Sequence, residues 1–356
     1  MSSLFTAEMQ EELKRPYLGD AERIVALTGG GYWPTLFKLK NNTLGAILRT
    51  GAPHVGNNGA LSFIYSADGG KNWSTPLTVV PPLADLDVRG SASGVMADGT
   101  IVCGYVETNW CISGKFDISK YSFSPYFVYS TDNGKTWSAK RKLIAPPFIE
   151  PALYGRICVL PDNTALMALY GRIEGKGKQI YSGIIRSTDN GRNWDDVSII
   201  APGFNETTLL YLPDGRLLAF MRQEGRAVGV FQAESTDNGY TWTKPYPLTV
   251  AHQHPADAVL LNTGTLLLTY GNRIGELAVG AMCSYDLGKT WEWKRRFILA
   301  KDSLILKGKT WGDCGYPTTV PLTDGTIVTL YYRLGHTGLS LEDQERCLQY
   351  LSLIHI

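Results

Sequence analysis

The chain has few of the residues that build metal sites and disulfide frameworks. Of its 356 residues, six are cysteine and five are histidine. No two cysteines form a Cys-x-x-Cys pair, and no cysteine and histidine have the spacing of a zinc site. We therefore expect free, mostly buried thiols, no metal and no cofactor.

The chain also lacks a surplus of charge of one sign and any long hydrophobic run. Its 34 basic and 33 acidic residues leave a net charge of +1, which offers no basic surface to nucleic acid. No apolar stretch approaches the roughly 20 residues of a membrane span. We expect neither nucleic acid nor a membrane as a partner, and the sequence carries no signal for an oligomeric state.

The two ends of the chain are set apart from its repeats. Residues 1–19 are interpreted as a helical or irregular lead without the apolar core of a signal peptide. The default expectation is a cytoplasmic protein, or a secreted or periplasmic one if the N-terminus is incomplete. Residues 351–356 match an in-frame translation of a sequencing-library adapter. We interpret them as a non-native tail on a truncated environmental (metagenome) gene, with an ordinary edge strand as the alternative.

One short pattern, Ser-x-Asp-x-Gly-x-x-Trp, is repeated between short apolar runs. Its aspartate can accept hydrogen bonds from nearby backbone N–H groups, and its glycine can take a positive φ, so each copy predicts a hairpin turn. The tryptophan supplies a large apolar surface that packs the hairpin against its sheet. We interpret these boxes as scaffold. The five copies span residues 66–73, 130–137, 187–194, 235–242 and 284–291.

A second pattern consists of two apolar runs joined by a tight turn of the Asp-Gly or Asn-Gly kind, a strong hairpin signal. Its copies recur at roughly fifty to sixty residues, within reach of a four-stranded propeller blade. We predict an all-β fold, a six-bladed β-propeller of four-stranded antiparallel blades, as a single domain over residues 1–350. The six turns span residues 39–44, 96–101, 160–165, 212–217, 261–266 and 322–327.

The order of these turns predicts how the ring closes and where a site lies. With strands a to d named outward from the axis, the last blade has its c strand near Arg346–Leu351 and no d strand after it. We expect an N-terminal strand, Glu22–Leu27, to fill that place and close the ring. Since strands alternate in direction, the boxes and a–b turns share one face. The starts of the inner strands and the b–c loops meet at a concave mouth on the other face.

Arginine is frequent among the residues expected at this mouth. A guanidinium group binds a carboxylate through two parallel hydrogen bonds, so the set indicates an anionic ligand. The b strands end near Arg49, Glu107, Arg172, Arg222, Arg273 and Arg333. The inner strands begin near Trp33, Arg89, Tyr154 with Arg156, Glu206, His254 with Asp257, and Tyr316.

Two stretches make the chain resemble the sialidase (neuraminidase) superfamily of Asp-box, or BNR-repeat, propellers. One is Asn205-Glu206-Thr207, followed by residues 212–218 and by Met221-Arg222. The other is Gly315-Tyr316-Pro317, followed by residues 324–326 and 330–332. Together with the boxes, the resemblance covers nearly the whole chain.

The resemblance implies a tyrosine nucleophile, Tyr316, activated by Glu206, with Arg222 and Arg273 gripping a substrate carboxylate. A phenol has a pKa near 10 and is a poor nucleophile until a carboxylate takes its proton. A tyrosine nucleophile also avoids the charge repulsion between a carboxylate nucleophile and an anionic sugar. Sialidases are accordingly an exception to the two-carboxylate rule of glycosidases.

Two positions depart from the superfamily pattern. Its first arginine stands in a Phe/Tyr-Arg-Ile-Pro motif, but here Trp33 takes that place. Its acid/base aspartate lies in the first b–c loop, yet residues 51–59 hold no carboxylate. Counting from the first box puts His54 there, and counting from Trp33 puts Asn57 there. We consider His54 as a proton-transfer residue or a structural loop residue, and Trp33 as a sugar-stacking platform or a core tryptophan.

The other predicted substrate contacts are Arg89, Tyr154, Arg156, His254 and Asp257. For His254 a structural role is the alternative, and the loop Glu107–Ser124 is interpreted as a lid, an interface or a packed loop. The predicted function is an exo-acting, sialidase-like glycoside hydrolase that releases a terminal, acidic sugar from a glycan or small glycoside. The alternatives are a polysaccharide lyase acting on uronates and a non-catalytic glycan-binding propeller.

Overall fold

The computed structural model describes residues 14–18, 21–52, 54, 56–112, 115–116, 122–225, 228–274, 277–301, 304–306, 309–311, 314–334 and 349–355. Within these ranges the chain is almost entirely β-strand, and its one helical element is the short 3-10 turn η2 (Trp293–Arg295). The all-β propeller fold predicted from the two repeats is confirmed.

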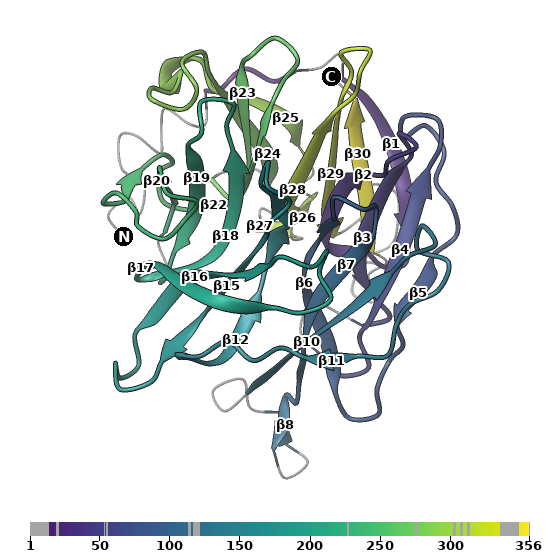
Figure 1. Cartoon of the computed structure of the whole chain (residues 1–356). Coiled ribbons are helices and arrows are strands. Elements are labelled where there is room, and N and C mark those ends of the chain that lie inside the picture. Colours follow the sequence, from purple (N-terminus) through teal and green to yellow (C-terminus); the bar gives the residue numbers. More distant parts are fainter. Residues whose placement is uncertain are drawn as a thin grey trace.

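In the described part of the chain, six sheets of four or five strands stand around a common axis (Figure 1). The inner strands of neighbouring sheets are in contact around the ring. In the first three sheets, from the inner strand outward, the order is β2 (Tyr32–Lys38), β3 (Leu44–Thr50), β4 (Ala60–Ser66) and β5 (Leu77–Val80); β6 (Asp87–Val95), β7 (Ile101–Thr108), β10 (Phe123–Ser130) and β11 (Arg141–Lys142); and β12 (Phe148–Leu153), β15 (Ala165–Ile173), β16 (Ile180–Ser187) and β17 (Asp195–Pro202).

The next three sheets complete the ring in the same inner-to-outer order. They are β18 (Phe204–Tyr211), β19 (Leu217–Gln223), β20 (Val230–Ser235) and β21 (Tyr246–Pro247); β22 (Gln253–Leu260), β23 (Leu266–Asn272), β24 (Ala278–Ser284) and β25 (Phe297–Lys301); and β28 (Cys314–Pro321), β29 (Ile327–Leu334), β30 (Gln349–His355) and β1 (Glu22–Thr28). Two short hairpins stand apart: β8 (Cys111–Ile112) with β9 (Lys115–Phe116), and β26 (Leu304–Leu306) with β27 (Lys309–Trp311).

Two sheets have a fifth strand, so the prediction of uniformly four-stranded blades was wrong. The third inner strand begins at Phe148, not near Tyr154, and it is interrupted after Leu153. Its next residues form β13 (Gly155–Arg156), which pairs in parallel with β6 of the preceding sheet. The following strand, β14 (Cys158–Val159), pairs antiparallel with β15 and so belongs to the third sheet again. The break falls at Gly155, whose φ of +91° a side-chain-bearing residue rarely adopts.

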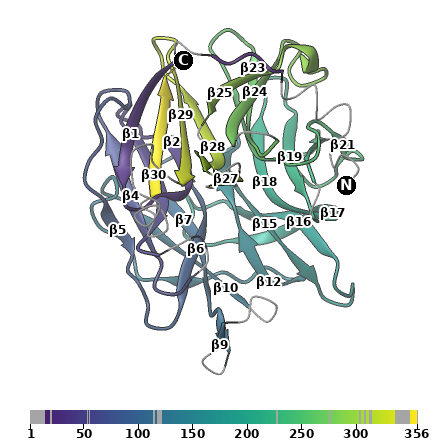
Figure 2. The same cartoon turned by 180° about the vertical axis from the view of Figure 1, so that it is seen from behind.

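The N-terminal strand closes the ring as predicted. β30 pairs with β29 on one side and with β1 on the other, so the two ends of the chain share one sheet. In Figure 2 the purple β1 lies beside the yellow β30. The third strand of this sheet is described over Gln349–His355, and residues 346–348 of the predicted strand lie outside the described residues. It also includes residues 351–355, which the sequence analysis set aside as a tail and which here pair on both sides.

The lead before β1 is described only over residues 14–18, and these residues contain no helix. They run along β25, where Tyr17 bridges to Ile298 and the Leu18 N–H donates to the Ile298 carbonyl at 2.9 Å. The helical interpretation of residues 1–13 and 19–20 lies outside the described residues.

The five boxes form the turns expected of them. In the first, the Asp68 carboxylate accepts from the Ser66 hydroxyl at 2.8 Å and from the Asn72 N–H at 2.9 Å. The Ser66 oxygen accepts from the Gly70 N–H at 2.8 Å, and the Trp73 indole donates to the Gly70 carbonyl at 2.9 Å. The Ser–Asp and Gly–Ser bonds recur in all five copies.

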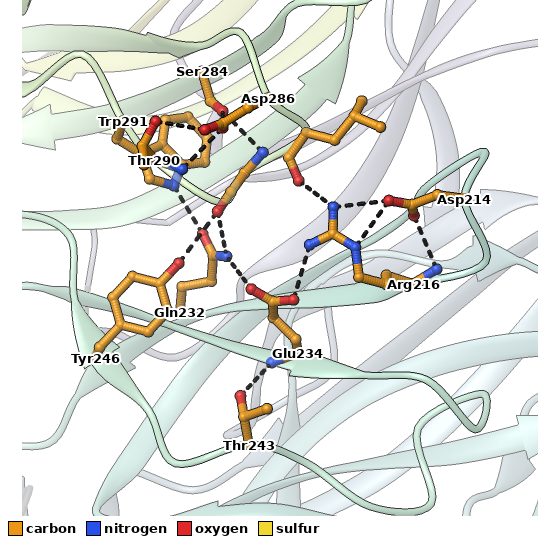
Figure 3. A network of polar contacts seen from close by, with 12 residues as sticks. Asp214, Arg216, Gln232, Glu234, Thr243, Tyr246, Ser284, Asp286, Thr290 and Trp291 are labelled. Carbon is orange, nitrogen blue, oxygen red and sulfur yellow. Dashed lines mark hydrogen bonds and ion pairs between the residues drawn. The ribbon is translucent and has the colours of Figure 1, made fainter.

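Each later box also joins its blade to the one before it. The last box shows this joint most fully (Figure 3). The Trp291 indole donates to the Gln232 side chain at 2.9 Å, and Gln232 donates to the Gly288 carbonyl at 2.9 Å. Arg216 donates to Glu234 at 2.8 Å and to the Leu287 carbonyl at 2.7 Å. The boxes are therefore inter-blade joints on the face opposite the mouth.

Protonating the box aspartates should loosen these turns. Hydrogen bonds from Asn72, Thr136 and Thr241 lower the pKa of Asp68, Asp132 and Asp237 from 3.8 to about 2. A pKa lowered by folding gives stability that is present above the unfolded value and lost as pH falls toward the folded one. The thermal midpoint should therefore drop between about pH 4 and pH 2. The thermal midpoint of Asp132→Asn checks this. The difference in midpoint between this variant and the wild type should narrow between about pH 4 and pH 2. A difference that stays constant with pH would contradict the prediction.

A β-bulge recurs at the mouth end of all six inner strands. The register shifts between Tyr32 and Thr35 in the first sheet and between Gly315 and Thr318 in the last, and at the matching place in the other four. A bulge leaves a residue unpaired and re-aims its side chain. At these bulges Trp33 has a φ of +49° and Tyr316 a φ of +52°. The bulges thus present one unpaired residue per blade at the mouth.

Candidate functional site

Three residues predicted for catalysis and binding meet at the mouth. The Tyr316 hydroxyl, from the last inner strand, donates to Glu206 Oε1 at 2.7 Å. Arg222 belongs to β19, which pairs with β18, the strand of Glu206. It donates to Glu206 Oε2 at 2.7 Å and lies 3.5 Å from the Tyr316 hydroxyl. Residues 110 positions apart in the chain are therefore joined by one hydrogen bond, and the Glu206 carboxylate bridges a phenol and a guanidinium.

The electrostatics of this trio define its resting protonation. Burial, and then the Glu206 charge, raise the pKa of Tyr316 well above its ordinary value, while Arg222 and Arg273 oppose the rise. Tyr316 is therefore a neutral hydroxyl at neutral pH, hydrogen-bonded to a group able to accept its proton. Although burial opposes it, Glu206 and Tyr316 raise the pKa of Arg222, which stays protonated.

Arg273 stands on the other side of Tyr316, at the end of β23. Its guanidinium donates to the His254 carbonyl. A Cβ added to Gly315 would lie 3.3 Å from Arg273 Nη2, and one added to Gly271 would lie 3.0 Å from Nη1. The two glycines therefore leave the space that this side chain occupies beside Tyr316.

Trp33 is buried and presents no open face to the mouth. The Arg89 guanidinium lies 4.4 Å over its ring, the His54 ring meets it edge-on at 5.0 Å, and the Tyr316 ring centroid is 6.3 Å away. The expected sugar-stacking platform is therefore covered by Arg89. Its packed-core alternative fits the 5% exposure of Trp33.

His54 lies in the first b–c loop, among aromatic rings. Besides Trp33, its ring contacts Tyr32 at 5.3 Å and Tyr332 at 6.3 Å, edge-on in both cases. Tyr332 in turn lies 5.7 Å from Tyr316, so His54 is separated from the phenol by one layer of rings.

Arg49 belongs to a buried ion pair beneath this layer. Its Nη2 lies 2.6 Å from Asp87 Oδ1, and both side chains are fully buried. The Trp110 indole donates to Asp87 Oδ2 at 2.8 Å, while Arg49 also donates to the Ala52 and Gly56 carbonyls at 2.9 and 3.0 Å. Arg49 was predicted as a mouth arginine. It instead anchors the first b–c loop, because it donates to two carbonyls of that loop and its charge is paired with Asp87 of the next blade.

A small cavity of about 50 Å³ lies beside the Tyr316–Glu206 pair. Its volume suits one or two water molecules and is far below that of a typical ligand pocket. Tyr154 is buried against Tyr316, with ring centroids 5.7 Å apart. Tyr170 was missed by the sequence analysis, since it lies inside a b strand and not at a strand end. The lining residues are Trp33, Arg89, Gly90, Val106, Phe123, Ala152, Leu153, Tyr154, Tyr170, Glu206 and Tyr316.

Arg156 and Asp257 do not join this cavity and pair with each other across the axis. Arg156 Nη2 lies 2.5 Å from Asp257 Oδ2, and Arg156 Nη1 donates to the Thr319 carbonyl at 2.8 Å. The same Asp257 oxygen accepts from the Thr319 N–H at 2.7 Å. These bonds tie the third, fifth and sixth inner strands together. His254 is buried and its carbonyl holds Arg273, so the structure places it as a support of that arginine.

Proline marks several bulges and was a missed signal. It follows the bulge residue in four inner strands, as Pro34, Pro151, Pro255 and Pro317. Proline has no N–H, so it suits a place where the ladder is interrupted. The pattern also locates Glu150, an exposed bulge residue with a φ of +47° that the sequence analysis did not name.

The residues that the structure describes contain no helix that is both long and apolar enough to cross a membrane. They also hold no group of three histidine, cysteine or carboxylate side chains arranged to bind a metal. The four cysteines described with their side chains are free thiols, and burial raises the pKa of Cys103 to about 12.

The repeat fold and the mouth constellation place the chain in the sialidase/BNR superfamily. A family model of the BNR repeat-like domain matches residues 114–329, more than half of the chain, so the chain belongs to this family. A BNR/Asp-box repeat model also matches residues 64–75, at the first box.

Similarity to curated proteins points the same way. The chain is 26% identical over 227 residues to a sialidase of Micromonospora viridifaciens, covering 57% of this chain and 32% of that protein. It is 29% identical over 202 residues to a sialidase of Paraclostridium sordellii, covering 51% and 49%. The matched region thus spans a third to a half of the length of these relatives.

Solved structures share the fold. A protein of unknown function from Dyadobacter fermentans superposes with a TM-score of 0.75 at 22% identity, covering 94% of this chain and 97% of that one. A Hadza microbial sialidase gives 0.69 at 19%, covering 92% and 65%. Trypanosoma rangeli sialidase in complex with 2,3-difluorosialic acid, a covalent intermediate, gives 0.68 at 14%, covering 96% and 59%.

Proposed function

We propose that the protein is an exo-acting glycoside hydrolase that releases a terminal acidic sugar, with Tyr316 as nucleophile and Glu206 as its base. The observation that carries this proposal is the 2.7 Å hydrogen bond from the Tyr316 hydroxyl to Glu206, with Arg222 on the far carboxylate oxygen. A buried tyrosine whose proton already faces a carboxylate is poised for attack as soon as a substrate carbon is brought to it.

The reaction proceeds in two displacements at the anomeric carbon. The Tyr316 oxygen attacks that carbon and Glu206 takes the phenolic proton, while the bond to the leaving oxygen breaks. The leaving oxygen needs a proton, and we assign its transfer to His54, the ionisable residue in the loop where the superfamily carries its acid. Water then attacks the same carbon and gives one proton to His54, the tyrosyl bond breaks, and Glu206 returns its proton to the phenolate.

Substrate charge follows from the guanidinium groups around the nucleophile. Arg222 and Arg273 flank Tyr316 and suit a carboxylate next to the anomeric carbon. The carboxylate of an acidic sugar also stabilises the positive charge that develops at the anomeric carbon in the transition state. An acidic sugar therefore suits both the two arginines and the reaction. We assign the substrate class as terminal acidic sugars on a glycan or a small glycoside.

Aryl glycosides of acidic and neutral sugars test this assignment. The wild-type protein should release the chromophore from an acidic glycoside and leave its neutral counterpart largely uncleaved, because only the acidic sugar offers a carboxylate to the guanidinium groups of Arg222 and Arg273. A product with the ultraviolet absorbance of an unsaturated uronate would identify a lyase instead. Binding of acidic sugars without any product would identify a glycan-binding propeller and refute the hydrolase.

A further inference from the structure

Arg89 is the one cationic residue among the lining residues of the cavity in the described part of the chain. It belongs to β6, in the second blade, whereas Arg222 and Arg273 come from the fourth and fifth. The described residues of the first blade, next to it, offer no cation to the cavity: position 33 is tryptophan, and the charge of Arg49 is neutralised by Asp87 at 2.6 Å.

Two indole rings hold the Arg89 guanidinium in place. Its Cζ lies 4.4 Å from the ring centroid of Trp33 and 4.8 Å from that of Trp110. Cation–π contacts of this kind favour a guanidinium stacked over the ring face. The rings thus fix Arg89 without using its N–H donors.

Those donors have no acceptor among the described residues. Asp87 Oδ2 is 4.0 Å from Arg89 Nη1, beyond hydrogen-bonding distance, and that carboxylate already accepts from Arg49 and Trp110. The Arg89 side chain is 16% exposed, and burial lowers its pKa. A mostly buried guanidinium whose N–H donors have no protein acceptor is available to donate to an anion delivered to the cavity.

We propose that Arg89 reads the carboxylate of the acidic sugar and takes over the part that the missing arginine at position 33 leaves open. This inference rests on the proposed function for the location of the sugar. Arg89 is then a specificity-determining residue, and Trp33 and Trp110 are its positioning residues. A tryptophan at position 33 is compatible with an anion site because its indole ring holds the Arg89 guanidinium, which takes the place of the missing arginine.

Calorimetric binding of N-acetylneuraminic acid and of its methyl ester tests the proposal. The ester keeps the sugar and loses the charge, so wild-type protein should prefer the acid. Arg89→Met should weaken binding of the acid about 10- to 100-fold and leave the ester nearly unchanged, as expected for a charge-assisted pair. Arg295→Met, at an arginine outside the mouth whose side chain is 78% exposed, should alter neither. Arg89→Lys, which keeps the charge but not the stacked fork, should lie between and carries the test if the methionine variant fails to fold.

The outcomes separate this inference from the proposed function. Arg89→Met that binds the acid as tightly as wild type, or a wild-type protein that does not prefer the acid to the ester, would overturn the role of Arg89. A wild-type protein that binds the acid through Arg89 but cleaves no glycoside would refute the hydrolase and leave the role of Arg89 intact.

Discussion

Tyr316→Phe should lower kcat/KM on a cleaved glycoside by about 10³-fold or more, because the substitution removes the nucleophilic oxygen and leaves every ring contact in place. The fold should be unaffected, since the lost hydroxyl bonds only within the Tyr316–Glu206–Arg222 trio. Initial rates of chromophore release measure the effect, and circular dichroism checks the fold.

A matched control for this variant is Tyr181→Phe. Its hydroxyl donates to Gln179 at 3.2 Å, remote from the trio, and its removal should leave the rate within about two-fold of wild type. Glu206→Gln should match Tyr316→Phe in its loss, because both remove one proton-transfer pair and effects within such a pair do not add. Turnover by Tyr316→Phe close to that of wild type would exclude the tyrosine mechanism.

Asp87→Ala should destabilise the protein by about 3–5 kcal/mol, the cost of leaving one partner of a buried ion pair uncompensated. The Arg49 and Asp87 side chains are both fully buried, so water cannot replace the lost contact. The Trp110 indole would lose its acceptor as well. Chemical denaturation followed by tryptophan fluorescence gives the change in unfolding free energy.

Asp98→Ala is the surface counterpart of that substitution. Asp98 lies 3.7 Å from Arg192, with the two side chains 40% and 31% exposed. An exposed pair of this kind contributes about 0–1 kcal/mol, so the control should barely move the midpoint. If Asp87→Ala cost no more than Asp98→Ala, the pair would not anchor the first b–c loop.

The part of the fold that was predictable from sequence is the part that depends on contacts between residues close together in the chain. Each box holds its own hydrogen bonds between residues two to four positions apart, as Ser66, Asp68 and Gly70 do, so a short window contains all the information. Ring closure was also predictable, because the last repeat lacks an outer strand and Glu22–Leu27 has the pattern of one.

The environment of the site residues was not predictable, because it depends on contacts between blades. Arg49 and Arg222 look alike at the ends of their b strands, yet Arg49 meets Asp87 from the next blade and Arg222 meets Glu206 within its own. The covering of Trp33 by Arg89 likewise joins two blades. Nor does a turn pattern report the detour at Gly155, where the inner strand pairs with the preceding sheet.

The predicted trio could be assembled because the propeller repeats in register. The inner strands all reach the mouth with the same bulge, so residues at matching places in different repeats become neighbours around one axis. Tyr316 and Glu206 meet for this reason, although the sequence carries no local signal that joins them. The remaining candidates, such as Arg156 and Asp257, lie deeper along the same strands and pair across the axis.

Trapping with 2,3-difluorosialic acid tests the central claim most directly. If Tyr316 attacks the anomeric carbon, fluoride leaves, the Tyr316 oxygen bonds to that carbon and Glu206 receives the proton. Intact mass spectrometry should then show one added fluorosialyl group, mapped to the peptide that contains Tyr316 and absent in Tyr316→Phe. A wild-type mass that does not change, or an adduct on any other residue, would contradict the account.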